Sequence, residues 1–446
     1  MQSRWKRKLK KAEKNKRERG ILIQRKKNKR KKTPELLRTK RIYPNKVFYF
    51  LRKRKFEKRR MTIKWGADKV TLIVPRCFSI SDNPDDTIDF LRELYYYGSR
   101  LDIKEINIDH SECYDLEIAA STIMDVIVLA IKEFHRRSKS NISFCGTIPA
   151  EGRVKDVFMA SGLAAHMELD MEQRISIDWE KIKRFKLISG YHRSEISGIT
   201  ATKLTEYIIT CMETQGYTLK SRGRNLLGNL FGEVLNNCEI HGGEDTTWFA
   251  LGHYQQYKTA EKYGEIQLVI FDFGNTIYEQ LKESTTSEET KEKLRYFSHV
   301  HEKYFGKKWT EEMLYTLLAL QEGISRLKNG SVEGNRRRGI GTVRLIESFQ
   351  QIGQTHDKRK PLMTITSGST HIKFDRTYRL KKEEFNDKEM GEGQRRIIAF
   401  NENNDIFQPP EHKFVQHLST FFPGTIISMK FFFDREYLTQ IMHSKH

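Results

Sequence analysis

Residues 230–243 have the sequence LFGEVLNNCEIHGG, which combines an apolar helical stripe with a row of polar side chains. The apolar positions recur at intervals of three and four residues, which predicts a helix whose apolar face packs inward. These positions are Leu226, Leu227, Leu230, Phe231, Val234, Leu235 and Cys238. A second edge of the same helix carries Asn229, Glu233, Asn237 and His241, which are spaced four residues apart. Such an edge is either an ordinary solvated face or the wall of a site, and the helix alone does not decide between them.

Two segments after this helix, 247–257 and 265–273, are rich in aromatic and β-branched residues and are predicted to be strands. The second strand runs directly into DFGNTI, which places Asp272 at the strand end and Gly274 two residues later. The rest of the chain contains three further elements of this kind. They are a basic Gly-x-Gly turn entering a helix (334–347), a hairpin (361–374) and a last strand (422–433) that includes Gly424 and Thr425.

Together and in this order, these segments resemble the nucleotide domain of the GHKL ATPases. This family includes gyrase-type, MutL-type, histidine-kinase and anti-sigma-kinase domains. GEVLNNCEIHG is similar to the anti-sigma-kinase form of the family's N box, and the resemblance covers roughly residues 200–435. It implies a Bergerat-type α/β sandwich over 201–446 that binds ATP and Mg²⁺.

The resemblance also implies a role for each matching residue. Glu233 would be the catalytic base that activates a water molecule, and Asn237 would supply an oxygen ligand to Mg²⁺, a cation that prefers hard oxygen ligands. Asp272 would accept a hydrogen bond from the adenine amino group, and Gly274 would let the backbone approach the base. The full set implied to bind ATP is Asn229, Asn236, Asn237, Asp272, Gly274, Ile277, Arg338, Gly339, Ile340, Gly341, Thr342 and Thr425.

The chain departs from the family pattern in three places. The motif DFGNTI has Asn275 and Thr276 where the family has part of a glycine-rich turn. Thr342 stands where the family usually has leucine. The 66 residues between Asp272 and Gly339 predict a long lid, 278–338, with a helix of its own at 309–327. These departures favour nucleotide binding over rapid hydrolysis.

The net charge of +22 belongs to the first sixty residues. Residues 1–60 hold 28 Lys and Arg against 4 Glu, whereas the other 386 residues hold 52 basic and 54 acidic side chains. Like charges at this density repel one another and cannot bury a core, which predicts a basic N-terminal extension. Its function is either to contact the phosphates of a nucleic acid or to act as a solubilising tail.

Residues 61–170 alternate strands and helices, which predicts a compact α/β domain with a mixed sheet. This order, together with FMASGLAAHM (158–167), resembles a STAS domain, the fold of anti-anti-sigma factors. In signalling members a phosphorylatable Ser opens the central helix. Here the turn is CYDLEIAAST, with Glu117 near that position, so the resemblance implies a protein-binding or structural role. Residues 171–200 are predicted to be a connector.

Cellular location and redox state follow from what the sequence contains. No apolar segment follows the basic start, and the longest apolar run, IMDVIVLAI, is far shorter than the ~20 residues that span a bilayer. The five cysteines form no C-x-x-C pair, so we expect reduced thiols and no zinc site. These features predict a cytoplasmic protein that does not contact the membrane.

Three hypotheses for function follow. The first is an ATPase that acts as a nucleotide-dependent regulatory switch, or a serine kinase of a protein partner. The second is a non-hydrolysing, nucleotide-gated interaction protein, with a protein partner on the STAS-like domain and nucleic acid on residues 1–60. The third is an α/β scaffold without a ligand. By analogy, the domain pair suggests bacterial regulation or defence, and the oligomeric state, including a dimer, stays open.

Overall fold

The computed structural model of this chain describes most of the residues from Pro44 onward, and Pro44–His446 form one compact unit. The described ranges are 44–58, 68–147, 182–258, 262–324, 341–352, 360–387 and 391–434, with a few positions between 149 and 158. The fold is of the α/β class, as predicted, with both parallel and antiparallel sheets. Among the described residues, none of the helices combines the length and the apolar character that a membrane crossing requires.

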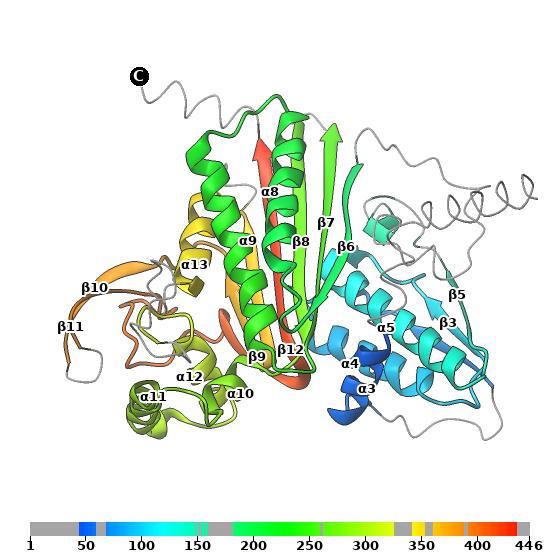
Figure 1. Cartoon of the computed structure of the whole chain (residues 1–446), viewed down its shortest axis with the longest axis horizontal. Helices are drawn as coiled ribbons and strands as arrows, with labels where there is room; N and C mark the ends of the chain where they lie inside the picture. The colour runs from blue at the N-terminus through cyan, green and yellow to red at the C-terminus, as the bar shows by residue number, and fades with distance from the viewer. Residues whose placement is uncertain are drawn as a thin grey trace, which may run out of the picture. The chain divides into compact units, whose positions relative to one another are not determined.

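The largest sheet has five strands in the order β6-β7-β8-β12-β9, and all neighbouring strands are antiparallel (Figure 1). The strands are β6 (Ile182–Tyr191), β7 (Thr247–Lys258), β8 (Lys262–Phe273), β9 (Leu362–Phe374) and β12 (Val415–Asp434). The edge strand β6 was not predicted, because 171–200 was interpreted as a connector. Its sequence, IKRFKLISGY, carries three cations, which is common at sheet edges because charge discourages pairing with other chains.

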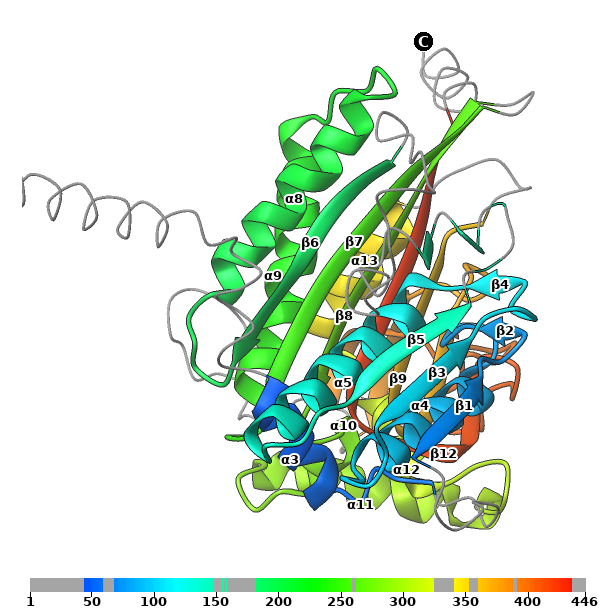
Figure 2. The same ribbon diagram turned by 90° about the vertical axis from the view of Figure 1, so that its right-hand side faces the viewer.

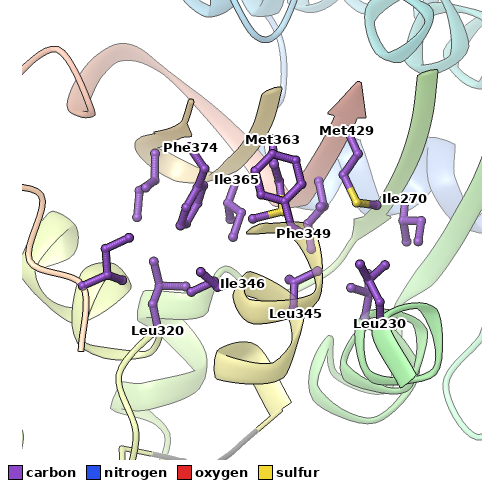
Figure 3. Packing of buried hydrophobic residues seen from close by; sticks show 14 of the residues in the cluster. Leu230, Ile270, Leu320, Leu345, Ile346, Phe349, Met363, Ile365, Phe374 and Met429 are labelled. Carbon is purple, nitrogen blue, oxygen red and sulfur yellow. The ribbon is translucent and has the colours of Figure 1, made fainter. Parts of the chain in front are cut away.

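Three helices cover one face of this sheet: α8 (Ser197–Glu213), α9 (Ser221–His241) and α13 (Gly341–Ile352) (Figure 1). The helix predicted around 230–243 is α9, which packs against both α8 and α13. Its apolar stripe is buried as predicted, except that Leu226 is only half-buried. In Figure 3, side chains from the helices point toward the sheet, among them Leu230, Leu345 and Phe349 facing Ile270, Met363 and Met429.

The N-terminal part contains a parallel three-stranded sheet in the order β1-β3-β5. The elements of this N-terminal part are β1 (Lys69–Ile73), β2 (Cys77–Phe78), α4 (Pro84–Gly98), β3 (Glu105–Asp109), β4 (Asp115–Leu116), α5 (Ile118–Arg137) and β5 (Ser143–Thr147). The predicted alternation of strands and helices is confirmed. The prediction of a mixed sheet is wrong for the described strands, because the helical crossovers α4 and α5 make β1, β3 and β5 all parallel. The helix α3 (Pro44–Lys53) lies within the segment 1–60 and packs against α5, where Phe48 stacks on Phe134.

This N-terminal part covers the second face of the five-stranded sheet (Figure 2). Phe249, Phe271 and Phe273 of β7 and β8 are buried in the same apolar cluster as the residues of α4 and α5. Glu117, which precedes α5, is also buried here and accepts a hydrogen bond from Ser428 Oγ of β12. The two predicted domains therefore share one core.

The region predicted as a lid contains helices that belong to the core. After β8 come α10 (Ile277–Lys282), α11 (Glu288–His301), the 3-10 helix η1 (Glu302–Tyr304) and α12 (Glu311–Leu318). Phe297, Trp309 and Met313 are buried together with side chains of the sheet. The strands β10 (Lys381–Asp387) and β11 (Gly391–Ile397) form a separate antiparallel pair. Closure of this region over a ligand stays a prediction.

The hairpin predicted at 361–374 is wrong. These residues form the single strand β9, which pairs with β12 along its length. Gly368 has φ of 62° and lies where the pairing becomes irregular, and a Cβ there would overlap the carboxylate of Glu312. The Ser-Gly-Ser sequence that predicted a turn therefore lies within one continuous strand, opposite the extra residues that bulge from β12 between His417 and Thr425.

Candidate functional site

The end of β8, the end of α9 and the middle of β12 meet around Asp272. Asp272 is the register partner of Thr425 in β12. The thiol of Cys238, near the end of α9, hydrogen-bonds to the Asp272 carboxylate. The backbone N–H of Asn275 donates to the carbonyl oxygen of Gly242 at 2.8 Å. Three segments that are distant in the sequence thus converge at one carboxylate.

Asp272 is only 2 % exposed, and its Oδ1 has no hydrogen-bond partner among the described residues. Burial raises the pKa of this carboxyl from 3.8 to about 7, although hydrogen bonds from the Cys238 thiol and the Thr425 backbone act to lower it. Burial and the neighbouring carboxylate hold the pKa of Cys238 well above its ordinary value, so it remains a thiol. A buried acceptor without a donor costs ~1–3 kcal/mol, so a ligand that supplies a donor here would be stabilised.

Three oxygen atoms approach the backbone of Gly274 closely. A Cβ at this position would lie 2.6 Å from the carbonyl oxygen of Gly242, 2.6 Å from Thr246 Oγ1 and 2.9 Å from Asp272 Oδ1. Thr246 is fully buried, and its hydroxyl has no partner among the described residues either. Two unpartnered buried oxygens therefore lie at a close approach that only glycine permits.

Thr425 and Ile277, both predicted site residues, are connected through a serine of β9. Ser367 Oγ lies 3.1 Å from Thr425 Oγ1 and accepts a hydrogen bond from the backbone N–H of Ile277 at 2.9 Å. Gly424, which precedes Thr425 in the chain, has φ of 141°, and a Cβ there would overlap the backbone of Asp272. The start of α10 and the strand pair β9–β12 are thus held next to Asp272.

The polar edge of α9 runs away from Asp272. Glu233 and Asn237 are half-buried, whereas Asn229 and Asn236 are exposed. Because each helical residue adds about 1.5 Å, Glu233 lies about 7 Å beyond Cys238 along the axis, and Asn229 about 13 Å. A ligand that extends from Asp272 along α9 would pass Asn237 and then Glu233. The side chain of His241 lies outside the described residues.

Glu239 of α9 is a buried acid that sequence analysis did not identify. Its carboxylate accepts hydrogen bonds from Ser194 Oγ and the backbone N–H of Ser197, both at 3.0 Å, and from the backbone N–H of Glu195. The helix α8 has Ile196 at its N-cap, without a side-chain cap of its own. Glu239 therefore satisfies the start of α8 from a neighbouring helix, which is a structural role.

The predicted phosphate turn falls largely outside the described residues, including Arg338, Gly339 and Ile340. The described part begins at Gly341, the first residue of α13, and Thr342 is half-buried in its first turn. The helix that begins at Gly341, α13, packs against α9. Contact between these residues and phosphate stays a prediction.

The metal prediction rests on Asn237 alone. Within the described ranges, no group of three or more His, Cys, Asp or Glu side chains is arranged to hold a metal ion. A half-buried amide at Asn237 fits the sparse protein ligation that Mg²⁺ accepts when phosphate oxygens complete its shell.

Comparison with known proteins does not identify the chain. No family model, no curated protein and no solved structure matches it.

Three residues of the site were not predicted from the sequence: Thr246, Cys238 and Ser367. Thr246 follows the acidic turn Glu244-Asp245, whose composition indicates only a solvated loop. Cys238 belongs to the apolar stripe of α9, and its thiol contact with Asp272 depends on the sheet register. Ser367 was interpreted as part of a turn. A buried-strand assignment for 361–374 was the one signal that could have identified it.

The elevated pKa of Asp272 predicts that stability falls with rising pH. The Asp272 carboxyl has a pKa of about 7 in the folded protein, whereas its ordinary pKa is 3.8. At pH values between these two, the folded state therefore binds more protons than the unfolded state. This stabilisation is complete below pH 3.8 and is lost as the pH rises through about 7. Relative to Asp272→Asn, the free energy of unfolding of the unliganded wild type should fall by about 3 kcal/mol between pH 5 and 8, at ~1.4 kcal/mol per pH unit. Urea titrations measure this, and parallel pH profiles would contradict it.

Proposed function

We propose that this chain is a GHKL-type ATPase, in which residues 201–446 bind ATP with Mg²⁺ and act as a nucleotide-dependent regulatory switch. One observation carries the proposal. Asp272 presents a buried, unpartnered oxygen at a strand end, and the unpartnered Thr246 hydroxyl also borders the close backbone approach at Gly274. An amino group on a flat ring that reaches Asp272 Oδ1 would supply the missing donor.

The adenine 6-amino group fits this requirement. It would donate to Asp272 Oδ1, and the Thr246 hydroxyl would bind a second polar atom of the base or a water molecule that bridges to it. Thr425, linked to Ser367, would support the base from the side of β12. The ribose and phosphates would then extend along α9 toward Asn237 and Glu233.

The proposed hydrolysis depends on the polar edge of α9. Glu233, as a half-buried carboxylate, would orient the attacking water and accept its proton. Asn237 would hold Mg²⁺, which supplies charge neutralisation for the phosphates when it is bound. Arg338 and the Gly339–Gly341 turn would contact the phosphates through their charge and backbone N–H groups.

The finer fold assignment and the partners are part of the same proposal. An antiparallel sheet with three helices on one face supports a Bergerat-type sandwich. The parallel strands β1-β3-β5 with α4 and α5 support a STAS-like domain. We assign a cytoplasmic protein partner to this domain and a nucleic acid to the basic extension.

Nucleotide binding by the full chain, measured by calorimetry with and without Mg²⁺ and followed by product analysis, tests the proposal. Binding of ATP with release of ADP and phosphate supports the ATPase. Transfer of phosphate to serine of an added partner supports the kinase alternative. Binding without product supports the nucleotide-gated interaction protein, and absence of binding overturns the proposal.

Two substitutions on α9 are expected to separate binding from hydrolysis. Glu233→Ala should bind ATP within about two-fold of wild type and lose hydrolysis by a factor of about 10² or more, because it removes a base and no phosphate contact. Asn237→Ala should lose the Mg²⁺-dependent part of ATP affinity. The matched control is Asn225→Ala, an exposed position on the same edge of α9 that is not among the residues implied to bind ATP, and it should behave as wild type. Full hydrolysis by Glu233→Ala would exclude this residue as the base.

Thr246→Val is expected to change stability and affinity in opposite directions. Valine has nearly the shape of threonine but lacks the unpartnered hydroxyl, so the free energy of unfolding without ligand should rise by about 1 kcal/mol. ATP affinity should fall about five-fold, because the hydroxyl is present to serve the ligand. Thermal unfolding with and without ATP measures both effects. An unchanged ATP affinity would remove Thr246 from the site.

A further inference from the structure

Arg54, just after α3, forms a close ion pair with the first turn of α10. Its Nη2 lies 2.6 Å from Glu279 Oε1 and 2.7 Å from Glu279 Oε2. Both side chains are partly buried, with 21 % and 35 % of their surfaces exposed. The guanidinium also lies over the rings of Phe50 and Phe421, at 5.9 Å and 5.6 Å from their centroids. Arg54 belongs to the basic segment 1–60, yet it contacts the folded body.

Glu279 holds the start of α10 through a capping box. Its Oε2 accepts a hydrogen bond from the backbone N–H of Thr276 at 2.8 Å, and the Thr276 hydroxyl accepts one from the backbone N–H of Glu279 at 3.2 Å. The same oxygen thus serves Arg54 and the N-terminus of α10. Arg54 therefore holds the Glu279 carboxylate in the position in which it caps the start of α10.

The start of α10 is in turn connected to Asp272. The backbone N–H of Ile277, the first residue of α10, donates to Ser367 Oγ, which lies next to Thr425 Oγ1. The backbone of Thr425 hydrogen-bonds to Asp272. Hydrogen bonds, joined through the backbone of Thr276–Ile277 and of Thr425, therefore connect the guanidinium of Arg54 to the carboxylate of Asp272.

We propose that Arg54 is a positioning residue for the nucleotide base, because it sets the start of α10 against Ser367 and Thr425. This inference rests on the proposed binding of ATP around Asp272. Arg54 precedes Asp272 by more than two hundred residues in the chain, and it would nevertheless contribute to recognition of the base. Arg54 acts through Glu279 and does not itself contact the ligand.

The test compares Arg54→Met with Lys58→Met in the full chain. Methionine retains the apolar part of either side chain and removes the charge. Lys58 pairs with Asp89 of α4, away from α10, and serves as the matched control. Affinities for adenosine, ADP and ATP are measured by calorimetry with Mg²⁺ present. We expect Arg54→Met to weaken all three about five-fold, since small displacements of positioning groups are costly, and Lys58→Met to match wild type.

Three further measurements separate positioning from general destabilisation. Arg54→Lys should recover part of the affinity, because it keeps the charge but not the planar guanidinium. In a Glu279→Gln background, Arg54→Met should cause no further loss, because both changes break the same interaction. An equal loss for adenosine and ATP places the effect at the base and not at the phosphates.

The outcomes distinguish this inference from the proposed function. Wild-type affinity in Arg54→Met, an equal loss in Lys58→Met, or an undiminished effect of Arg54→Met in the Glu279→Gln background would each overturn the inference alone. Absence of adenosine, ADP and ATP binding by the wild-type chain would overturn the proposed function and the inference with it.

Discussion

Asp272→Asn is expected to weaken ATP binding at least about ten-fold. The substitution keeps the shape of the side chain but replaces a charged acceptor with an amide, and a hydrogen bond to a charged group contributes ~1.5–3 kcal/mol. At ~1.4 kcal/mol per decade, this range corresponds to a ten-fold to hundred-fold loss. The effect is large because Asp272 Oδ1 has no other partner among the described residues, so nothing nearby replaces the lost acceptor.

Base selectivity provides the control for this substitution. Wild type should prefer ATP over ITP, because the 6-oxo group of ITP presents an acceptor to a carboxylate. Asp272→Asn should lose most of that preference, since its amide can donate. A protein damaged elsewhere would lose affinity for both nucleotides and keep the ratio. Wild-type affinity and an unchanged ratio in Asp272→Asn would place the base elsewhere.

Deletion of residues 1–43 is expected to abolish nucleic-acid binding and leave ATP binding intact. These residues hold 20 Lys and Arg against 3 Glu. The deletion stops at Pro44 because α3 contributes Phe48 and Leu51 to the core, so a chain that begins near Met61 would lack buried side chains. Because bound phosphates release counterions, the affinity of the full chain should fall by about three orders of magnitude between ~50 and ~200 mM salt with half a dozen contacts.

Unrelated duplexes and single strands of equal length are the control for this deletion. Lys and Arg contacts to phosphate position a chain without reading bases, so the affinities of different sequences should agree within a few-fold. Equal binding by the chain that begins at Pro44 would move the contact to the folded body. If the full chain does not bind at low salt, the basic segment is a solubilising tail or binds an acidic protein.

The parts of the fold that could be predicted are those with a strong local pattern. The α9 helix was identified from the spacing of its apolar residues, and β8 from its run of branched and aromatic side chains that ends at Asp272. The parts that were missed depend on distant contacts. The β6 strand mixes three cations with apolar residues without a regular alternation, and is recognisable only as the edge of a sheet. The β9 strand contains a Ser-Gly-Ser sequence that locally favours a turn.

The same distinction applies to the site. Asp272 and Gly274 were identified because a strand end followed by glycine is visible in the sequence. Thr246 was missed because only the folded chain brings it to the same close approach as Asp272, around Gly274. The sequence also does not show that the Thr246 hydroxyl has no partner among the described residues. Arg54 was interpreted as one more cation of the basic segment, since only the folded chain brings it to Glu279.

The core that the N-terminal part shares with one face of the five-stranded sheet limits how this protein can respond to a ligand. A swing of the N-terminal part about a linker would bring Phe249, Phe271 and Phe273 into water. At ~25 cal/mol per Å², and with aromatic side chains that bury ~150–250 Å² each, such opening would cost on the order of 10 kcal/mol. Packed interfaces of this kind respond by small sliding displacements and not by hinge rotation. Any signal from the strand ends around Asp272 would therefore travel as shifts of about an ångström in α10, α3 and α5. Partners would detect it on the outer surface of the same compact unit.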